Sequence, residues 1–251
     1  MTAALVLVVL GLTGCANNQF TRIGFPNPIT EQGKTVIRIW QGSWIAGMAV
    51  GILVWGMILW AVIFHRKRSD RLPPQARYNM PIEIMYTAVP FVLIAILFYY
   101  TAKDENYLDA VSAKPDVQVN VLGFQWSWQF NYPQYHVTNT GNMNGNGPLP
   151  VLEIPTGKTV EFNLTSADVL HAFWVPEFLY KRDVIPGHPN HFQITATQTG
   201  TFLGHCSELC GVYHSKMLFT VKVVTPQQFQ ADMAAEQAAQ QNTAQTSGSA
   251  Q

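Results

Sequence analysis

The stretch "SWIAGMAVGILVWGMILWAVIF", residues 43–64, contains no charged side chain. At 1.5 Å per residue in an α-helix, it is long enough to cross the roughly 30 Å hydrocarbon core of a membrane. A second apolar run, "IMYTAVPFVLIAILFYYTA", occupies residues 84–102 and includes Pro90, which a packed membrane helix tolerates. The two runs predict a transmembrane helical hairpin over residues 43–102, which makes the chain a membrane-anchored α + β protein.

The segment between the two runs predicts how the hairpin is oriented. Residues 65–82 carry five Lys or Arg residues and one Asp. Because short cytoplasmic loops are enriched in Lys and Arg, this linker is predicted to lie in the cytoplasm. Both helices then leave the cytoplasm, so residues 15–42 and everything from residue 103 onward are predicted to be extracytoplasmic.

The N-terminal run "ALVLVVLGLTGC" is too short to span a membrane but suits the apolar part of a signal peptide, predicted over residues 1–14. The letters "LTGC" resemble a bacterial lipobox, which implies that Cys15 is lipidated and becomes the first residue of the mature chain. The run departs from the usual signal in one respect, since no Lys or Arg precedes it. The alternative is an unmodified Cys15 in an apolar leader.

Charged residues make up only 12% of the chain, about half the share in ordinary globular proteins. Residues 1–102 hold eight Lys or Arg and three Asp or Glu, a balance of +5, while residues 103–251 hold seven and twelve, a balance of −5. This asymmetry argues against a nucleic-acid binder and indicates a cationic partner for the acidic part. Three cysteines are too few for a disulfide framework.

Residues 103–224 contain short β-rich runs, such as "VQVNVL", "TVEFNL" and "MLFTVKVV", separated by Pro, Gly and Asn. This spacing predicts an antiparallel β-sandwich or small barrel. Residues 225–241 then predict a closing helix, with Thr225 as its cap and Pro226 in its first turn. The remaining tail, "NTAQTSGSAQ", is predicted to be disordered.

The stretch "GHCSELCGVYHSKM", residues 204–217, gathers Cys206, Cys210, His214 and Met217, and the upstream "SADVLHAFWVP" adds His171. Two thiolates, two imidazoles and a thioether form a soft donor set that favours copper. A mononuclear blue-copper site uses one Cys, whereas two thiolates can bridge two copper ions. Three alternatives remain open: a zinc site that leaves the thioether unused, a redox disulfide, and buried structural cysteines.

These two segments, the two helices, "FQWSWQF" and "DVIPGHPN" closely resemble cytochrome c oxidase subunit II of the haem–copper oxidase family. The resemblance covers most of the chain. It implies a cupredoxin-like β-sandwich over residues 103–224 and a dinuclear copper centre, CuA. The implied copper ligands are His171, Cys206, the backbone carbonyl of Glu208, Cys210, His214 and Met217.

The resemblance also implies roles for three other side chains. Glu208 helps to bind a Mg²⁺ ion shared with subunit I, Trp126 receives electrons from a c-type cytochrome, and Glu83 lies near the entrance of a proton pathway into subunit I. The simpler readings are a solvated carboxylate at a helix start for Glu83 and a core tryptophan for Trp126, although Trp128 fits the core better. Candidate acids for docking the cytochrome are Asp104, Glu105, Asp109, Asp116, Asp168, Glu177 and Asp183.

The function implied is that of subunit II of a bacterial cytochrome c oxidase in the cell membrane, in contact with lipids and the other oxidase subunits. It passes electrons to haem in subunit I, where oxygen is reduced and protons are pumped. The chain lacks a C-x-x-C-H motif, so the electron donor is expected to be another polypeptide. The alternative function is a membrane-anchored copper-binding or copper-delivery module. A quinol-oxidase subunit would lack the ligands, and a nitrous oxide reductase would need a further domain.

Overall fold

The computed structural model describes residues 21–68, 75, 77–142 and 147–248. They form two compact units, one made of Ile37–Tyr107 and the other of the remaining described residues. The predicted signal peptide, residues 1–14, and the predicted lipidation site Cys15 lie outside the described residues.

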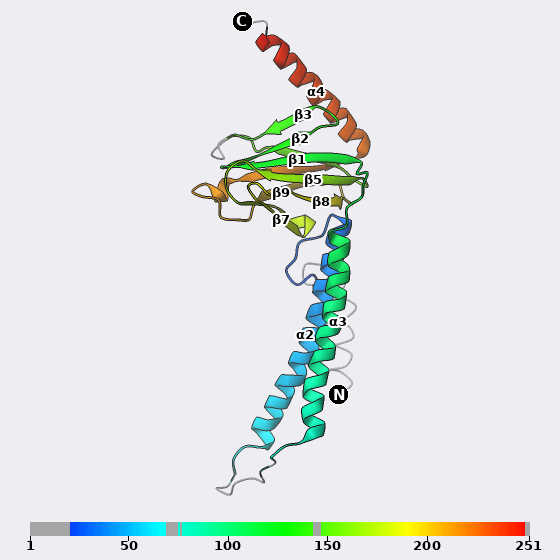
Figure 1. Cartoon of the computed structure of the whole chain (residues 1–251), viewed down its shortest axis with the longest axis vertical. Helices are drawn as coiled ribbons and strands as arrows, with labels where there is room; N and C mark the ends of the chain where they lie inside the picture. The colour runs from blue at the N-terminus through cyan, green and yellow to red at the C-terminus, as the bar shows by residue number, and fades with distance from the viewer. Residues whose placement is uncertain (1–20, 69–74, 76, 143–146, 249–251) are drawn as a thin grey trace, which may run out of the picture. The chain divides into compact units, whose positions relative to one another are not determined.

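Two long apolar helices, α2 Glu31–Phe64 and α3 Met80–Leu108, lie side by side and form the hairpin (Figure 1). Both are long and apolar enough to cross a membrane, with mean hydropathies of 2.3 and 2.0 over their most apolar windows. Arg38 on α2 approaches the carboxylate of Asp104 on α3 to 3.9 Å. The two apolar helices predicted from the sequence are therefore confirmed, and each is longer than its apolar run.

Helix α2 begins twelve residues before the apolar run because its start is capped. The hydroxyl of Thr30 accepts a hydrogen bond from the backbone N–H of Gly33 at 2.9 Å, as an N-cap residue does. In the first turn, Lys34 pairs with Glu31 at 2.8 Å. Residues 31–42, which the sequence analysis placed in the extracytoplasmic segment before the hairpin, are helical.

Among the described residues, ten strands form two five-stranded sheets packed face to face. The first sheet has the order β3-β2-β1-β5-β8, from β1 Val117–Phe124, β2 Ser127–Tyr132, β3 Val137–Thr140, β5 Thr159–Ser166 and β8 Asn190–Thr195. The second has the order β4-β10-β9-β6-β7, from β4 Val151–Pro155, β6 His171–Val175, β7 Tyr180–Val184, β9 Gly200–Cys206 and β10 Leu218–Val224. The predicted β-sandwich is confirmed.

The sheets are mixed rather than purely antiparallel. Strand β1 runs parallel to β5, and β10 runs parallel to β4, while the other pairs are antiparallel. Parallel neighbours need a crossover connection, and here the chain crosses to the other sheet between the partners. Local strand patterns do not reveal such pairings, because the partner strands are far apart in the sequence.

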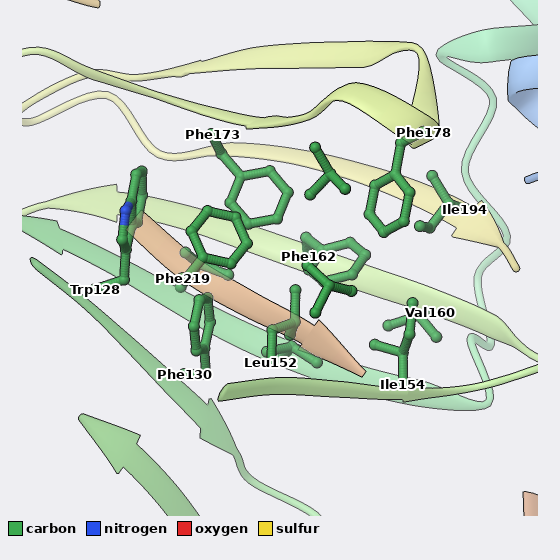
Figure 2. Close-up of a cluster of buried hydrophobic side chains, with 14 of the residues drawn as sticks. Trp128, Phe130, Leu152, Ile154, Val160, Phe162, Phe173, Phe178, Ile194 and Phe219 are labelled. Atoms are coloured by element: carbon green, nitrogen blue, oxygen red, sulfur yellow. The ribbon is translucent and has the colours of Figure 1, made fainter. Parts of the chain in front are cut away.

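Aromatic and aliphatic side chains fill the space between the sheets (Figure 2). Strand β1 alternates buried and less buried residues, as a strand with one face on a core does. The rings of Phe173 and Phe219 stack with centroids 5.0 Å apart, and those of Phe162 and Phe192 stack at 4.9 Å. Burial of such rings contributes strongly to stability, so the strands beneath the loops form a rigid support.

A segment before the hairpin belongs to the β-sandwich. Ile29 is buried, its N–H donates to the carbonyl of Glu177 at 3.0 Å, and its carbonyl accepts from Thr197 at 2.7 Å. At Gly33 an added Cβ would lie 2.8 Å from the carbonyl oxygen of Phe178, so the helix start approaches the sandwich closely. The described residues up to Val36 therefore group with the sandwich, not with a separate segment ending at residue 42.

Helix α4, Pro226–Gly248, packs on the sandwich beside β3 (Figure 1). Its predicted cap is confirmed, since the Thr225 hydroxyl accepts from the N–H of Gln228 at 3.2 Å. Phe229 and Met233, one turn apart, are buried against the sheets. Helix α4 continues through residues 242–248, the first part of the tail that was predicted to be disordered. A helix that is already docked extends without a new nucleation cost.

Candidate metal centre

Three neighbouring strands of the second sheet bring the predicted ligands to one end of the sandwich. His171 opens β6 and Cys206 closes β9, and these two strands pair there through Phe173 and Cys206. Cys210 follows in the loop, and the loop returns through the short 3₁₀ helix η3, His214–Lys216, to Met217 and β10. Strand pairing therefore assembles residues that are up to 46 positions apart in the sequence, counted from 171 to 217.

Two sulfurs lie at the centre of the cluster, with one imidazole beside each. The Sγ atoms of Cys206 and Cys210 are 3.8 Å apart. Nδ1 of His171 lies 3.9 Å from the Cys206 sulfur, and Nδ1 of His214 lies 3.6 Å from the Cys210 sulfur. The sulfurs are free thiols, far beyond the S–S bond length of about 2.05 Å. This symmetric arrangement fits two metal ions that share the sulfurs.

Two weaker donors complete the set, one beside each sulfur. The thioether Sδ of Met217 lies 3.7 Å from the Cys210 sulfur, and the backbone carbonyl of Glu208 lies 3.1 Å from the Cys206 sulfur. A Cys₂His₂ zinc site would use neither of them. The thioether beside thiolates and imidazoles favours copper, since zinc is bound by Cys, His and carboxylate ligands and magnesium by oxygen ligands. The donor atoms of His171, Cys206 and Cys210 all lie within 4.8 Å of one another, close enough to hold a metal ion.

The outer nitrogen of His171 is held by a carboxylate. Nε2 lies 2.8 Å from Oδ1 of Asp168. An ionised carboxylate only accepts hydrogen bonds, so Nε2 carries the hydrogen and Nδ1 keeps its lone pair for a metal on the Cys206 side. Asp168 also accepts from the backbone N–H groups of Gln125, at 2.7 Å, and Val169, at 2.6 Å.

The same contacts shift the proton affinities of the cluster. Burial raises the pKa of Asp168, but the hydrogen bonds from Gln125 and His171 outweigh it and lower the pKa below its usual value. Burial also lowers the pKa of His171, while its bonds to Cys206 and Asp168 raise it overall.

The two thiols are shifted in opposite directions. Against the effect of burial, the His171 imidazole and nearby backbone N–H groups lower the pKa of Cys206 to about 7. Burial and the adjacent Cys206 sulfur raise the pKa of Cys210 to about 12. Cysteine binds a metal as the thiolate, so both thiols must lose their protons when a metal binds. Metal binding and proton release are therefore linked in this cluster.

Trp126 lies against the ligand loop. Its indole N–H donates to the carbonyl of Cys210 at 3.2 Å, and its half-buried ring meets Tyr213 edge-to-face at 5.0 Å. The loop can approach because Gly211 has a φ of +125° and an added Cβ would lie only 3.0 Å from the indole nitrogen. Trp128, in contrast, is fully buried among core aromatics, as expected.

The two predicted glutamates have different surroundings. Glu208 is half-buried between the two cysteines. Glu83 lies in the first turn of α3, in the other compact unit, and its carboxylate accepts from the backbone N–H of Asn79 at 3.0 Å. Glu83 therefore satisfies one of the unpaired N–H groups of a helix start.

Several of the acids expected to dock a cationic partner are already engaged. Asp109 pairs with Arg182 at 2.7 Å, and Asp116 contacts Lys158 at 3.4 Å. The loop that carries the sulfurs instead exposes apolar side chains, with Leu209 at 80% and Val212 at 83% exposure. From the sequence, Asp168 was predicted only as an acid for docking, and Gln125 was not predicted as a site residue. The spacing of an Asp three residues before His171 was the available signal.

Comparisons with known proteins decide the family. The family model for the periplasmic domain of cytochrome c oxidase subunit II matches residues 117–224. A probable cytochrome c oxidase subunit 2 of Streptomyces avermitilis is 49% identical over 267 residues, covering 92% of this chain and 83% of the relative. This chain belongs to the cytochrome c oxidase subunit II family.

A second curated relative agrees with this assignment. A cytochrome c oxidase subunit 2 of Mycobacterium bovis is 36% identical, over 92% of this chain and 79% of the relative. The solved periplasmic domain of the Bradyrhizobium japonicum subunit II is 31% identical with a TM-score of 0.47, and covers 51% of this chain and 99% of that domain. As a cytochrome c oxidase subunit II, the chain is part of an oxidoreductase, with two apolar helices, a β-sandwich and a His–Cys–Cys group suited to copper.

Proposed function

We propose that this subunit II receives single electrons from a c-type cytochrome at a dinuclear CuA centre. It passes them to haem in subunit I, where oxygen is reduced to water and protons are pumped. The observation that carries the proposal is the pair of sulfurs 3.8 Å apart, each with its own imidazole. A mononuclear copper site has no use for the second cysteine.

The proposed ligands are His171, Cys206, Cys210, His214 and Met217, together with the backbone carbonyl of Glu208. When bound, a copper pair that shares its charge over two metals and two sulfurs supplies a one-electron relay with little change in bond lengths. The residues of the chain hold that geometry in both redox states, because His171 and Cys206 lie on paired strands and the other ligands lie in the short loop that joins β9 to its partner β10, above an aromatic core.

Trp126 is the proposed point at which electrons enter. Its ring is half-buried, and its N–H contacts the carbonyl of the ligand Cys210. The exposed apolar side chains of Leu209 and Val212 flank the same loop and offer a docking area for the cytochrome.

The remaining assignments are proposals of the same kind. The Glu208 carboxylate, a hard oxygen ligand, helps to bind Mg²⁺ shared with subunit I. Glu83 lies near the entrance of a proton pathway, in addition to capping α3. The hairpin crosses a bacterial cell membrane twice with its linker in the cytoplasm, Cys15 carries a lipid anchor, and the other oxidase subunits and lipids cover the helices.

The test uses the full-length chain in detergent, because residues near Ile29 are part of the sandwich. The chain is loaded with copper, the metal content is measured, and an EPR spectrum is recorded. Two coppers per chain and seven hyperfine lines are expected, since one unpaired electron couples equally to two copper nuclei. One copper with four lines would overturn the relay and favour copper binding or delivery.

A further inference from the structure

We propose that Asp168 is a positioning residue that holds the copper ligand His171 and the Gln125–Trp126 turn in one hydrogen-bonded arrangement. The proposal rests on the proposed function, since it assigns a role at the same centre. The single carboxylate of Asp168 then fixes both the orientation of the His171 ring and the position of Trp126, the proposed electron entry point.

The two oxygens of Asp168 serve two different parts of the chain. Oδ1 accepts from Nε2 of His171 at 2.8 Å and from the N–H of Val169 at 2.6 Å. Oδ2 accepts from the N–H of Gln125 at 2.7 Å. The first contact lies at the start of β6, and the second lies in the turn between β1 and β2. The carboxylate therefore joins the two sheets at the metal end of the sandwich.

From Gln125 the bonding continues to the other half of the centre. The Gln125 side-chain N–H₂ donates to the carbonyl of Cys210 at 2.7 Å, and the Trp126 indole donates to the same oxygen at 3.2 Å. A continuous path thus runs from His171 through Asp168 and Gln125 to Cys210. The sulfur contacts close this path into a ring, because Cys206 lies 3.8 Å from Cys210 and 3.9 Å from His171.

This ring predicts measurable properties of the centre. A carboxylate on the outer imidazole nitrogen fixes the tautomer and makes the metal-facing nitrogen more basic. A more basic ligand stabilises the oxidised metal more than the reduced metal, so removal of the carboxylate should raise the reduction potential. Loss of such an outer contact typically weakens metal binding or activity by about 10–100-fold.

The test compares Asp168→Asn with wild type in the full-length, copper-loaded chain. An amide has a single acceptor oxygen, so Asn cannot serve both His171 and Gln125. We expect copper affinity to fall about 10–100-fold and the potential to rise, a tenfold change in relative stability being about 59 mV for one electron. The EPR hyperfine pattern should change as well.

The matched control is Asp116→Asn, which removes the same charge at the far end of strand β1 from Gln125. It should leave copper affinity and potential unchanged. A second variant, Gln125→Ala, keeps the backbone N–H that binds Asp168 but removes the side-chain bond to Cys210. In the assembled oxidase it should slow electron input from the cytochrome while the potential stays near that of wild type.

The outcomes separate this proposal from the proposed function. Wild type with one copper would defeat the proposed function. The positioning role alone would be defeated if wild type binds two coppers and Asp168→Asn has the same copper affinity, EPR spectrum and reduction potential as wild type. If the Asn variant does not fold, the wild-type protein still decides: electron–nuclear double resonance should detect a slowly exchanging proton on Nε2 of His171, and a freely exchanging one would overturn the proposal.

Discussion

The two compact units of this subunit II differ in where their apolar side chains find contacts. In the sandwich, aromatic and β-branched residues pack against one another, and the proposed metal ligand His171 is held by a hydrogen bond. In the hairpin, the most apolar windows of α2 and α3 have no residue buried inside the chain. An added Cβ at Gly47 or Gly51 would meet nothing within 4 Å, so these small residues leave room for a neighbour.

This difference teaches where each unit obtains its stability. The sandwich carries its own core and can hold a metal centre in fixed geometry. The apolar surface of the hairpin is not covered by the chain itself, as is usual for helices that lie in a membrane. Substitutions of the same kind should therefore have different effects in the two units.

The largest effect is expected at the sulfur of the proposed ligand Cys206. Cys206→Ser replaces a soft thiolate by a hydroxyl, which is a poor copper ligand, and should abolish the two-copper centre. Metal analysis and EPR of the full-length chain should show at most one copper and no seven-line pattern. The neighbouring Ser207→Ala is the control and should bind two coppers, since only its backbone N–H contacts Ala172. Two coppers in the Cys206→Ser variant would contradict the assignment of this ligand.

A matched pair of truncations compares the cores directly. Phe173→Ala removes a ring stacked in the sandwich and should lower the free energy of unfolding by about 3–5 kcal/mol. Phe98→Ala removes a ring that is 73% exposed on α3, and it should change the free energy of unfolding of the isolated chain by about 0.5 kcal/mol or less. Denaturant unfolding in detergent, followed by tryptophan fluorescence, measures both. Equal losses would show that the hairpin has a core of its own.

The sandwich also contains a buried acid whose charge should oppose folding. Glu153 is 4% exposed, and its burial and the adjacent Asp232 on α4 raise its pKa to about 7, against a smaller opposing effect of Lys222. Because the folded pKa lies above the unfolded value, this group stabilises the protonated folded state at low pH. That contribution is lost as pH rises through about 7.

Glu153→Gln should therefore stabilise the sandwich by about 1–3 kcal/mol near pH 8 and do little near pH 4. Thermal unfolding followed by circular dichroism across this range measures the difference. Glu161→Gln, at a partly exposed acid on β5, is the control and should not reproduce the pH dependence. An unchanged pH profile in Glu153→Gln would show that this carboxyl is not the titrating group.

The smallest effect concerns the start of helix α2, which lies in the same compact unit as the sandwich. Thr30→Ala removes the hydroxyl that caps α2 and also donates to the carbonyl of Phe178 at 3.3 Å. The free energy of unfolding should fall by about 1 kcal/mol, and the amide hydrogen of Gly33 should exchange faster. Thr30→Ser keeps the hydroxyl and should retain most of the protection. Equal exchange in Ala and wild type would mean that tertiary packing alone holds the helix start.

The elements that were predicted correctly are those with a strong local pattern. The apolar runs, the β-rich segments and the capped closing helix are visible within windows of about 10–20 residues. The start of α2 at Glu31 was missed because its first turns are polar and their contacts lie with residues near 178 and 195. The parallel pairs were missed for the same reason, since long-range pairing leaves no local signal.

In the candidate site, too, the ligands that lie close together in the sequence were predicted, and a contact between distant residues was missed. The loop from Cys206 to Met217 keeps most of its donors within one short stretch, so their spacing indicated a metal site. Asp168 and Gln125 lie 43 positions apart and meet only in the folded sandwich. Their side chains are common surface types, so only the geometry distinguishes them from ordinary polar residues.

The contact between helix α4 and strand β3 has a consequence for solubility. Strand β3 is the edge of its sheet, and an open edge can pair with a strand of another chain. The Gln240 side-chain amide bonds both the N–H of Thr138, at 3.2 Å, and its carbonyl, at 2.9 Å. A single side chain thus pairs with the backbone of Thr138 as a neighbouring strand would, so this part of the edge is no longer open to a strand of another chain.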